Sequence, residues 1–201
     1  MWIELSEGEA LDRLTILEIK RENSSESINR SEVEKELMCY NEINTIKNKY
    51  RIYYNLLYYV NKTIWDKTDE IKMLDVLDET FAKLSFDIFE LNQQRFRMKN
   101  SINQLENSNY KEQKSYSKKN IVYEHKSSGA SSYEDMLCIL LYLLVTYDTV
   151  QIINSDYIDK SRIQLLLPSL KIIENVTNKI DEIELSQSMK EEFMKIIMKS
   201  F

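Results

Sequence analysis

An arginine stands at an inward position of an otherwise apolar helical pattern. Arg95 fills the slot between Leu91 and Met98, and at 100° per residue it falls in the middle of that helix's apolar arc. A buried guanidinium is costly unless a carboxylate pairs with it. Glu18 lies inside the apolar arc of the first helical segment, whereas Asp12 falls on its outer side. We therefore predict that Glu18 and Arg95 form a partly buried, structural ion pair. A catalytic role is disfavoured because the pair has no acid–base partner.

A second candidate site is a serine-rich loop. The single histidine, His125, ends a predicted strand and is followed by small residues and a helix start. Ligands of open α/β sheets bind beyond the carboxyl ends of strands, and free amides at a helix start attract anions. The candidate ligand-binding residues are His125, Lys126, Ser127, Ser128, Gly129, Ser131 and Ser132. The competing interpretation is an ordinary serine cap, because the loop matches no established phosphate-binding motif and no catalytic triad is identifiable.

The first half of the chain should be helical. Glycine and proline are scarce, at 2 and 1 residues, which favours long uninterrupted helices. Capping boxes at 6–9 and 31–34 begin a short helix, ending near 22, and a much longer one. Apolar residues then recur at steps of three and four on both sides of a polar break at 66–69. This pattern predicts an antiparallel helical hairpin over 31–106, with coiled-coil packing.

The second half of the chain changes to strand and helix patterns in alternation. The predicted elements are strands at 121–124 and 149–153, helices at 133–146 and from about 157 to Pro168, a third strand at 182–185, and a final helix capped by Ser188. The segment around 182–185 could equally extend a helix. We predict a predominantly helical α+β chain with a helical hairpin domain (1–110), a linker (111–120) and a small α/β domain (121–201) with two or three parallel strands.

Composition excludes several classes of protein. The net charge of −6 provides no basic field for nucleic acid, and the modest basic run at 111–119 lies in the predicted linker. With two distant cysteines and one histidine, no zinc site of usual type and no cofactor is indicated. The longest apolar run, 136–145, is about half of what a bilayer requires, and the N-terminus lacks the pattern of a signal peptide. We expect a cytoplasmic protein, in the host cytoplasm or the virion if its source is viral.

Two parts of the chain resemble known families. Residues 9–20, 92–103 and 112–116 are similar to an uncharacterised family of small bacterial helical proteins, a likeness covering about residues 5–117 and including Glu18 and Arg95. That resemblance implies an association with glycosyltransferase-like and polysaccharide-related proteins. Residues 120–201 resemble the start of a doubly wound nucleotide-sugar glycosyltransferase domain, through His125, Gly129 and the run 147–150. The glycine-rich turn is mostly serine here, and an expected acidic residue is replaced around Ala130, so the resemblance implies a truncated relative without transferase activity.

Three functions follow as hypotheses. The first is a non-catalytic binding or assembly module whose hairpin self-associates or docks a protein partner, as an accessory to glycan synthesis or in a viral particle. Tyrosines 54, 58 and 59, on the flank of the long helix, would support self-association if exposed. The second is a nucleotide-sugar or phosphate binder, or a glycosyltransferase-related enzyme, using the loop after His125. A nucleic-acid-binding helical protein is the least favoured.

Overall fold

The computed structural model describes residues 4–23, 27–110, 112, 119–124, 132–153, 159–173 and 183–201. The chain divides into two compact units, Met1–Glu112 and Gln113–Phe201. As predicted, the protein is a predominantly helical α+β chain with a small parallel sheet.

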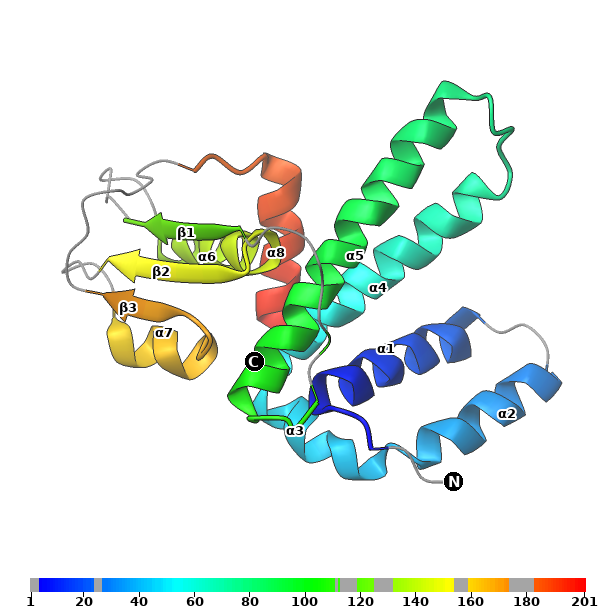
Figure 1. The fold of residues 1–201 in the computed structure, drawn as a ribbon, viewed down its shortest axis with the longest axis horizontal. Coiled ribbons are helices and arrows are strands. Elements are labelled where there is room, and N and C mark those ends of the chain that lie inside the picture. Colours follow the sequence, from blue (N-terminus) through cyan, green and yellow to red (C-terminus); the bar gives the residue numbers. More distant parts are fainter. Residues whose placement is uncertain are drawn as a thin grey trace. The chain divides into compact units, whose positions relative to one another are not determined.

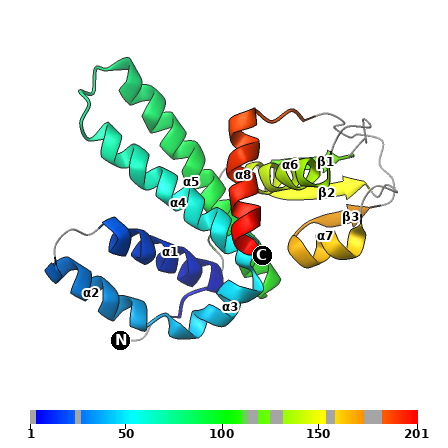
Figure 2. The same cartoon turned by 180° about the vertical axis from the view of Figure 1, so that it is seen from behind.

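All the regular secondary structure among the described residues of the first unit is helical. Its elements are α1 (Glu7–Asn23), α2 (Ser27–Met38), the 3₁₀ turn η1 (Asn41–Ile43), α3 (Asn44–Lys49), α4 (Arg51–Ile71) and α5 (Glu79–Leu105). Helices α4 and α5 form the antiparallel hairpin, and α1 contacts both of them as well as α2 (Figures 1 and 2). The predicted arrangement of a first helix packed on a helical hairpin is therefore confirmed.

The boundaries of the predicted hairpin were wrong in two places. The helix expected to begin with a capping box at residue 31 already begins at Ser27, and it is broken into α2, η1, α3 and α4, so only α4 belongs to the hairpin. The expected turn at 66–69 is helical, because Asp66 pairs with Lys62 at 2.5 Å and Lys67 pairs with Asp87 of α5 at 2.9 Å. The real connection is 72–78, where the Asp78 side chain accepts a hydrogen bond from the amide of Thr80 and caps α5.

The core of the first unit lies where α1 meets the base of the hairpin. Packing there removes the apolar face of every contributing helix from water, which is the main source of stability for helices of this length. The side chains buried in this core include Leu11, Leu14, Leu17 and Ile19 of α1, Tyr53, Leu56, Leu57 and Val60 of α4, and Met98 and Ile102 of α5.

The second unit is a small parallel sheet with helices. The strands β1 (Asn120–Tyr123), β2 (Thr149–Ile153) and β3 (Lys171–Ile173) lie in the order β1-β2-β3, with Ile121 opposite Val150 and Ile152 opposite Ile172. The helices are α6 (Tyr133–Thr146), α7 (Lys160–Leu166) and α8 (Gln187–Ser200). Helix α6 contacts β2 and α8, which explains why it is apolar nearly all round.

Two details of the second unit correct the sequence prediction. Residues 183–185 are not in a strand, and the third strand is 171–173 instead. The chain turns into it just after α7, where the amide of Leu170 donates to the carbonyl of Leu167 across Pro168. The final helix is capped by Ser186, whose hydroxyl accepts from the amide of Met189 at 3.3 Å, and not by Ser188.

Candidate functional site

A buried polar network joins α1 to both helices of the hairpin. The side chain of Asp12 on α1 is 0% exposed, and Arg95 of α5 donates to both of its carboxylate oxygens, one bond measuring 2.8 Å. Asn61 of α4 donates to Asp12 at 2.8 Å and to the hydroxyl of Thr15 at 2.7 Å. Bidentate pairing of this kind is strong and directional. The network therefore fixes α1 against α4 and α5 at one point.

The predicted partner of Arg95 was wrong: the carboxylate is Asp12, not Glu18. Glu18 instead accepts hydrogen bonds from Lys47, at 2.8 Å, and from the hydroxyl of Tyr54. Helix α1 contacts α2 as well as the hairpin, so it is buried on more than one side. A prediction that assumes one apolar arc on α1 therefore assigns Asp12 and Glu18 to the wrong surroundings.

Two tyrosines of α4 lie against the carboxylates of α1. Tyr54 donates to Glu18, and Tyr58 donates to Glu22 at 2.5 Å. Burial raises the pKa of both phenols well above the ordinary value, and the accepting carboxylates raise each pKa further. Tyr54 is only 4% exposed, so it is part of the α1–α4 interface rather than of a free surface.

Gly8 brings the backbones of α1 and α5 into contact. Its amide donates to the side-chain oxygen of Asn103 at 2.7 Å. A Cβ atom at this position would clash with the carbonyl oxygen of Lys99 and lie 2.9 Å from the carbonyl carbon. Only glycine fits here without a shift of one helix, so the helix start is anchored directly on α5.

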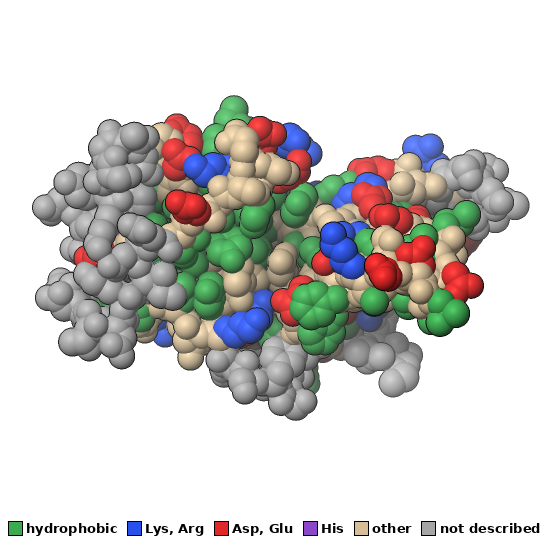
Figure 3. All heavy atoms as spheres, turned by 90° about the horizontal axis from the view of Figure 1, so that it is seen from above, with side chains coloured by type: hydrophobic (Ala, Val, Ile, Leu, Met, Phe, Trp, Pro, Cys, Tyr) green, Lys and Arg blue, Asp and Glu red, His purple; other side chains and the backbone are tan. Residues whose placement is uncertain are grey.

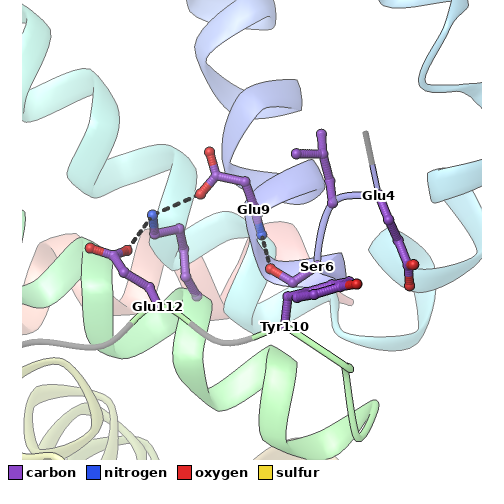
Figure 4. A pocket seen from close by; sticks show the side chains of 7 residues that line it. Glu4, Ser6, Glu9, Tyr110 and Glu112 are labelled. Carbon is purple, nitrogen blue, oxygen red and sulfur yellow. Dashed lines mark hydrogen bonds and ion pairs between the residues drawn. The ribbon is translucent and has the colours of Figure 1, made fainter. Parts of the chain in front are cut away.

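An open hollow of about 510 Å³ lies beside this contact, lined by Glu4, Leu5, Ser6, Glu9, Lys99, Tyr110 and Glu112. Figure 4 shows the carboxylates of Glu9 and Glu112 meeting one ammonium group, while Glu4 points away and the ring of Tyr110 lies beside Ser6. That ammonium group is Lys99, 3.0 Å from Glu9 and 2.8 Å from Glu112. The hollow is therefore lined by a half-buried cluster of ion pairs centred on Lys99.

The charges of this cluster are fixed near neutral pH. Burial raises the pKa of Glu9, but the hydrogen bond and charge of Lys99 outweigh burial and leave the pKa below its ordinary value. Burial lowers the pKa of Lys99, and its two carboxylate partners reverse this and raise the pKa overall. A general acid or base needs a pKa near the working pH. Neither Glu9 nor Lys99 meets that requirement, so neither is suited to act as a general acid or base near neutral pH.

The predicted ligand-binding loop falls mostly outside the described residues. Six of the seven candidate residues lie outside the described ranges: His125, Lys126, Ser127, Ser128, Gly129 and Ser131. Ser132 is described, and it begins α6 through a capping box: its hydroxyl accepts from the amide of Asp135 at 3.1 Å, and Asp135 accepts in return from the Ser132 amide at 3.2 Å. Ser132 therefore caps the helix, and its side chain is directed to α6.

The outer half of the hairpin carries an exposed apolar surface. The α1 contacts described above fall between Tyr54 and Asn61 on α4 and between Arg95 and Asn103 on α5. In residues 62–94, only Leu84 is buried. Five large apolar residues there, which we call the tip residues, are 55–92% exposed: Met73, Val76, Leu77, Phe86 and Phe89.

Two classes of site are absent among the residues that the structure describes. No group of three or more His, Cys, Asp or Glu side chains is arranged to hold a metal ion in these ranges. None of the described helices combines the length and apolar character needed to span a bilayer.

A family model matches residues 1–136, so the chain belongs to the family DUF6165, described as a family of unknown function. No curated protein matched the chain, and no solved structure matched it. The matched segment includes the whole helical unit and continues through β1 into the start of α6. The resemblance to glycosyltransferase-associated proteins stays a prediction.

Proposed function

We propose that this member of DUF6165 is a non-catalytic binding module that docks another protein chain on the outer half of its α4–α5 hairpin. The observation that carries the proposal is the contrast along the hairpin. Its base is clamped by α1 around a packed core, whereas the outer half has a single buried side chain and five exposed tip residues.

Single exposed apolar side chains are normal on a protein surface, whereas a group of them indicates an interaction site. Met73, Val76 and Leu77 lie within one short connection, and Phe86 and Phe89 are one helical turn apart on α5. At 100° per residue, Phe86 lies about 160° from both Leu84 and Ile88, and Phe89 lies about 140° from Leu84 and about 100° from Ile88, so both point away from the seam that faces α4. Helix α5 therefore has a second apolar face, as expected for a helix that packs between two layers.

The buried parts of the first unit support binding over catalysis. Asp12 is saturated by donors from Arg95 and Asn61, and Glu9 and Lys99 keep their charges at neutral pH. These groups hold α1 on the hairpin base. A rigid base that presents an apolar end is an arrangement suited to docking.

The test is site-specific photo-crosslinking in the cell that naturally makes the chain. A benzophenone amino acid replaces Leu77, which is 92% exposed, or Leu165 of α7, which is 80% exposed and serves as the control. We expect a discrete product of one partner from position 77, identified by mass spectrometry, and none from position 165. The double variant Phe86→Ser, Phe89→Ser should abolish this product while keeping the helical circular dichroism signal, since both side chains are more than half exposed. A product that survives both serines, or no product from position 77, would contradict the proposal.

A further inference from the structure

The charge of the chain is concentrated at the outer half of the hairpin. Residues 62–94 carry eight carboxylates and four lysines, so this segment alone has a net charge of −4 against −6 for the whole chain. Three of these carboxylates pair with lysines: Asp66, Asp69 and Asp87. The other five are in no ion pair among the described residues: Glu70, Asp75, Asp78, Glu79 and Glu90. The tip residues therefore sit in a strongly acidic field.

Carboxylates and hydrophobic side chains lie side by side on this part of the surface (Figure 3), at the right of the view, where the connection between α4 and α5 faces the reader. This combination of negative charge and apolar side chains limits which kind of partner can bind to the tip residues. A second copy of the hairpin would bring two segments with a net charge of −4 together, and like charges facing each other disfavour association. An anionic lipid surface is disfavoured for the same reason.

We infer that the tip residues bind a basic amphipathic helix of another protein, with apolar side chains on one face and Lys or Arg on its flanks. This inference rests on the proposed docking function and names the chemistry of the partner. Along α5, the distance from its first residue, Glu79, to Phe89 is about 15 Å at 1.5 Å per residue, which about 10 helical residues would span. Apolar anchors at i, i+3, i+4 and i+7 are the usual way in which such a helix binds. The flanking cations would meet the unpaired carboxylates.

The experiment measures binding of synthetic peptides to the full chain by fluorescence anisotropy. The probe is a helical peptide of about 18 residues with Leu and Phe on one face and Lys on the other. One control peptide replaces every Lys by Glu, and the other scrambles the basic peptide so that it has no apolar face. We expect the basic amphipathic peptide to bind about tenfold or more tighter than either control, and its affinity to fall as salt is raised.

Matched charge variants locate the effect on the hairpin. Glu70→Lys with Glu79→Lys brings the net charge of residues 62–94 to zero, whereas Glu36→Lys with Glu184→Lys makes the same net change at exposed positions outside the hairpin. We expect the first pair to weaken binding about tenfold and the second to leave it within about twofold. Equal binding of the acidic peptide, equal binding of the scrambled peptide, or equal weakening by both variant pairs would overturn the inference.

The crosslinking assay separates this inference from the proposed function. If the product from position 77 is lost with Phe86→Ser, Phe89→Ser but unchanged with Glu70→Lys, Glu79→Lys, docking stands and the basic partner is refuted. A product with twice the mass of the chain identifies a second copy, which also refutes the basic partner. A product lost in both variant pairs supports both.

Discussion

Replacing Arg95 by alanine should strongly destabilise the helical unit. The carboxylate of Asp12 is 0% exposed, and without the guanidinium it keeps only the hydrogen bond from Asn61. Breaking a buried ion pair from one side typically costs about 3–5 kcal/mol. The side chain of Arg95 is 27% exposed, so water can partly replace it, and we take the lower end, about 3 kcal/mol.

The assay is urea unfolding followed by tryptophan fluorescence. Trp65 lies on α4 of the first unit, so its emission reports the unfolding of that unit. With an m-value of about 1.5 kcal/mol/M, a loss of 3 kcal/mol lowers the midpoint by about 2 M. The matched control is Arg13→Ala: this arginine is 51% exposed and pairs with Glu9 within one helical turn. It should change stability by about 0.5 kcal/mol or less.

A double-mutant cycle with Asp12→Ala isolates the pair. We expect a coupling free energy of about 2–3 kcal/mol between Asp12 and Arg95. A loss below about 1 kcal/mol for Arg95→Ala, or a coupling near zero, would refute the reasoning that this pair clamps α1 on the hairpin.

Three further predictions concern other buried groups. Gly8→Ala should cost about 2 kcal/mol in the same urea assay, because the new methyl group clashes with the backbone of Lys99 unless a helix shifts; an unchanged midpoint would show that the helices can separate freely. Burial raises the pKa of Cys138 to about 11, so a thiol reagent should label the exposed Cys39 rapidly and Cys138 only after unfolding; equal rates in the native chain would contradict this. Burial, and then the hydrogen bond to Glu18, raise the pKa of Tyr54. The contribution of this phenol to the free energy of unfolding is therefore complete below the pKa of a tyrosine in the unfolded chain, about 10, and is lost as the pH rises further. Unfolding free energy should therefore fall with pH more steeply for the natural chain than for Tyr54→Phe, by up to about 1.4 kcal/mol per pH unit; parallel slopes would argue against a buried phenol.

Much of the fold followed from local patterns, and the failures have physical causes. The helix at 133–146 and the first two strands were predictable because apolar runs and caps coincide there. The hairpin turn was misplaced because Asp66 and Asp69 were interpreted as helix breakers, although they pair with Lys62 and Lys72 on the helix surface. Sequence periodicity cannot distinguish a paired polar helical surface from a turn.

The polar network was only half predictable. Arg95 stood out because it interrupts a regular apolar seam along its helix. The other members of the network could not be identified in this way: Asp12, Thr15 and Asn61. Helix α1 is covered from several sides, so its polar residues can be buried, and Asn61 is adjacent to Val60, which already occupies the core position in the apolar pattern of α4. The polar spacing of Asp12 and Thr15 on one helix face was the available signal, but identifying their partners required the tertiary arrangement.

The single buried side chain between residues 62 and 94 also has a consequence for dynamics. Local opening costs least where few contacts must break, so amide hydrogen exchange should be slow near Tyr53 and Met98 and quicken steadily towards the connection at 72–78. A bound helix would suppress that gradient from the far end. Protection factors along α4 and α5 would then report occupancy without any label on either protein.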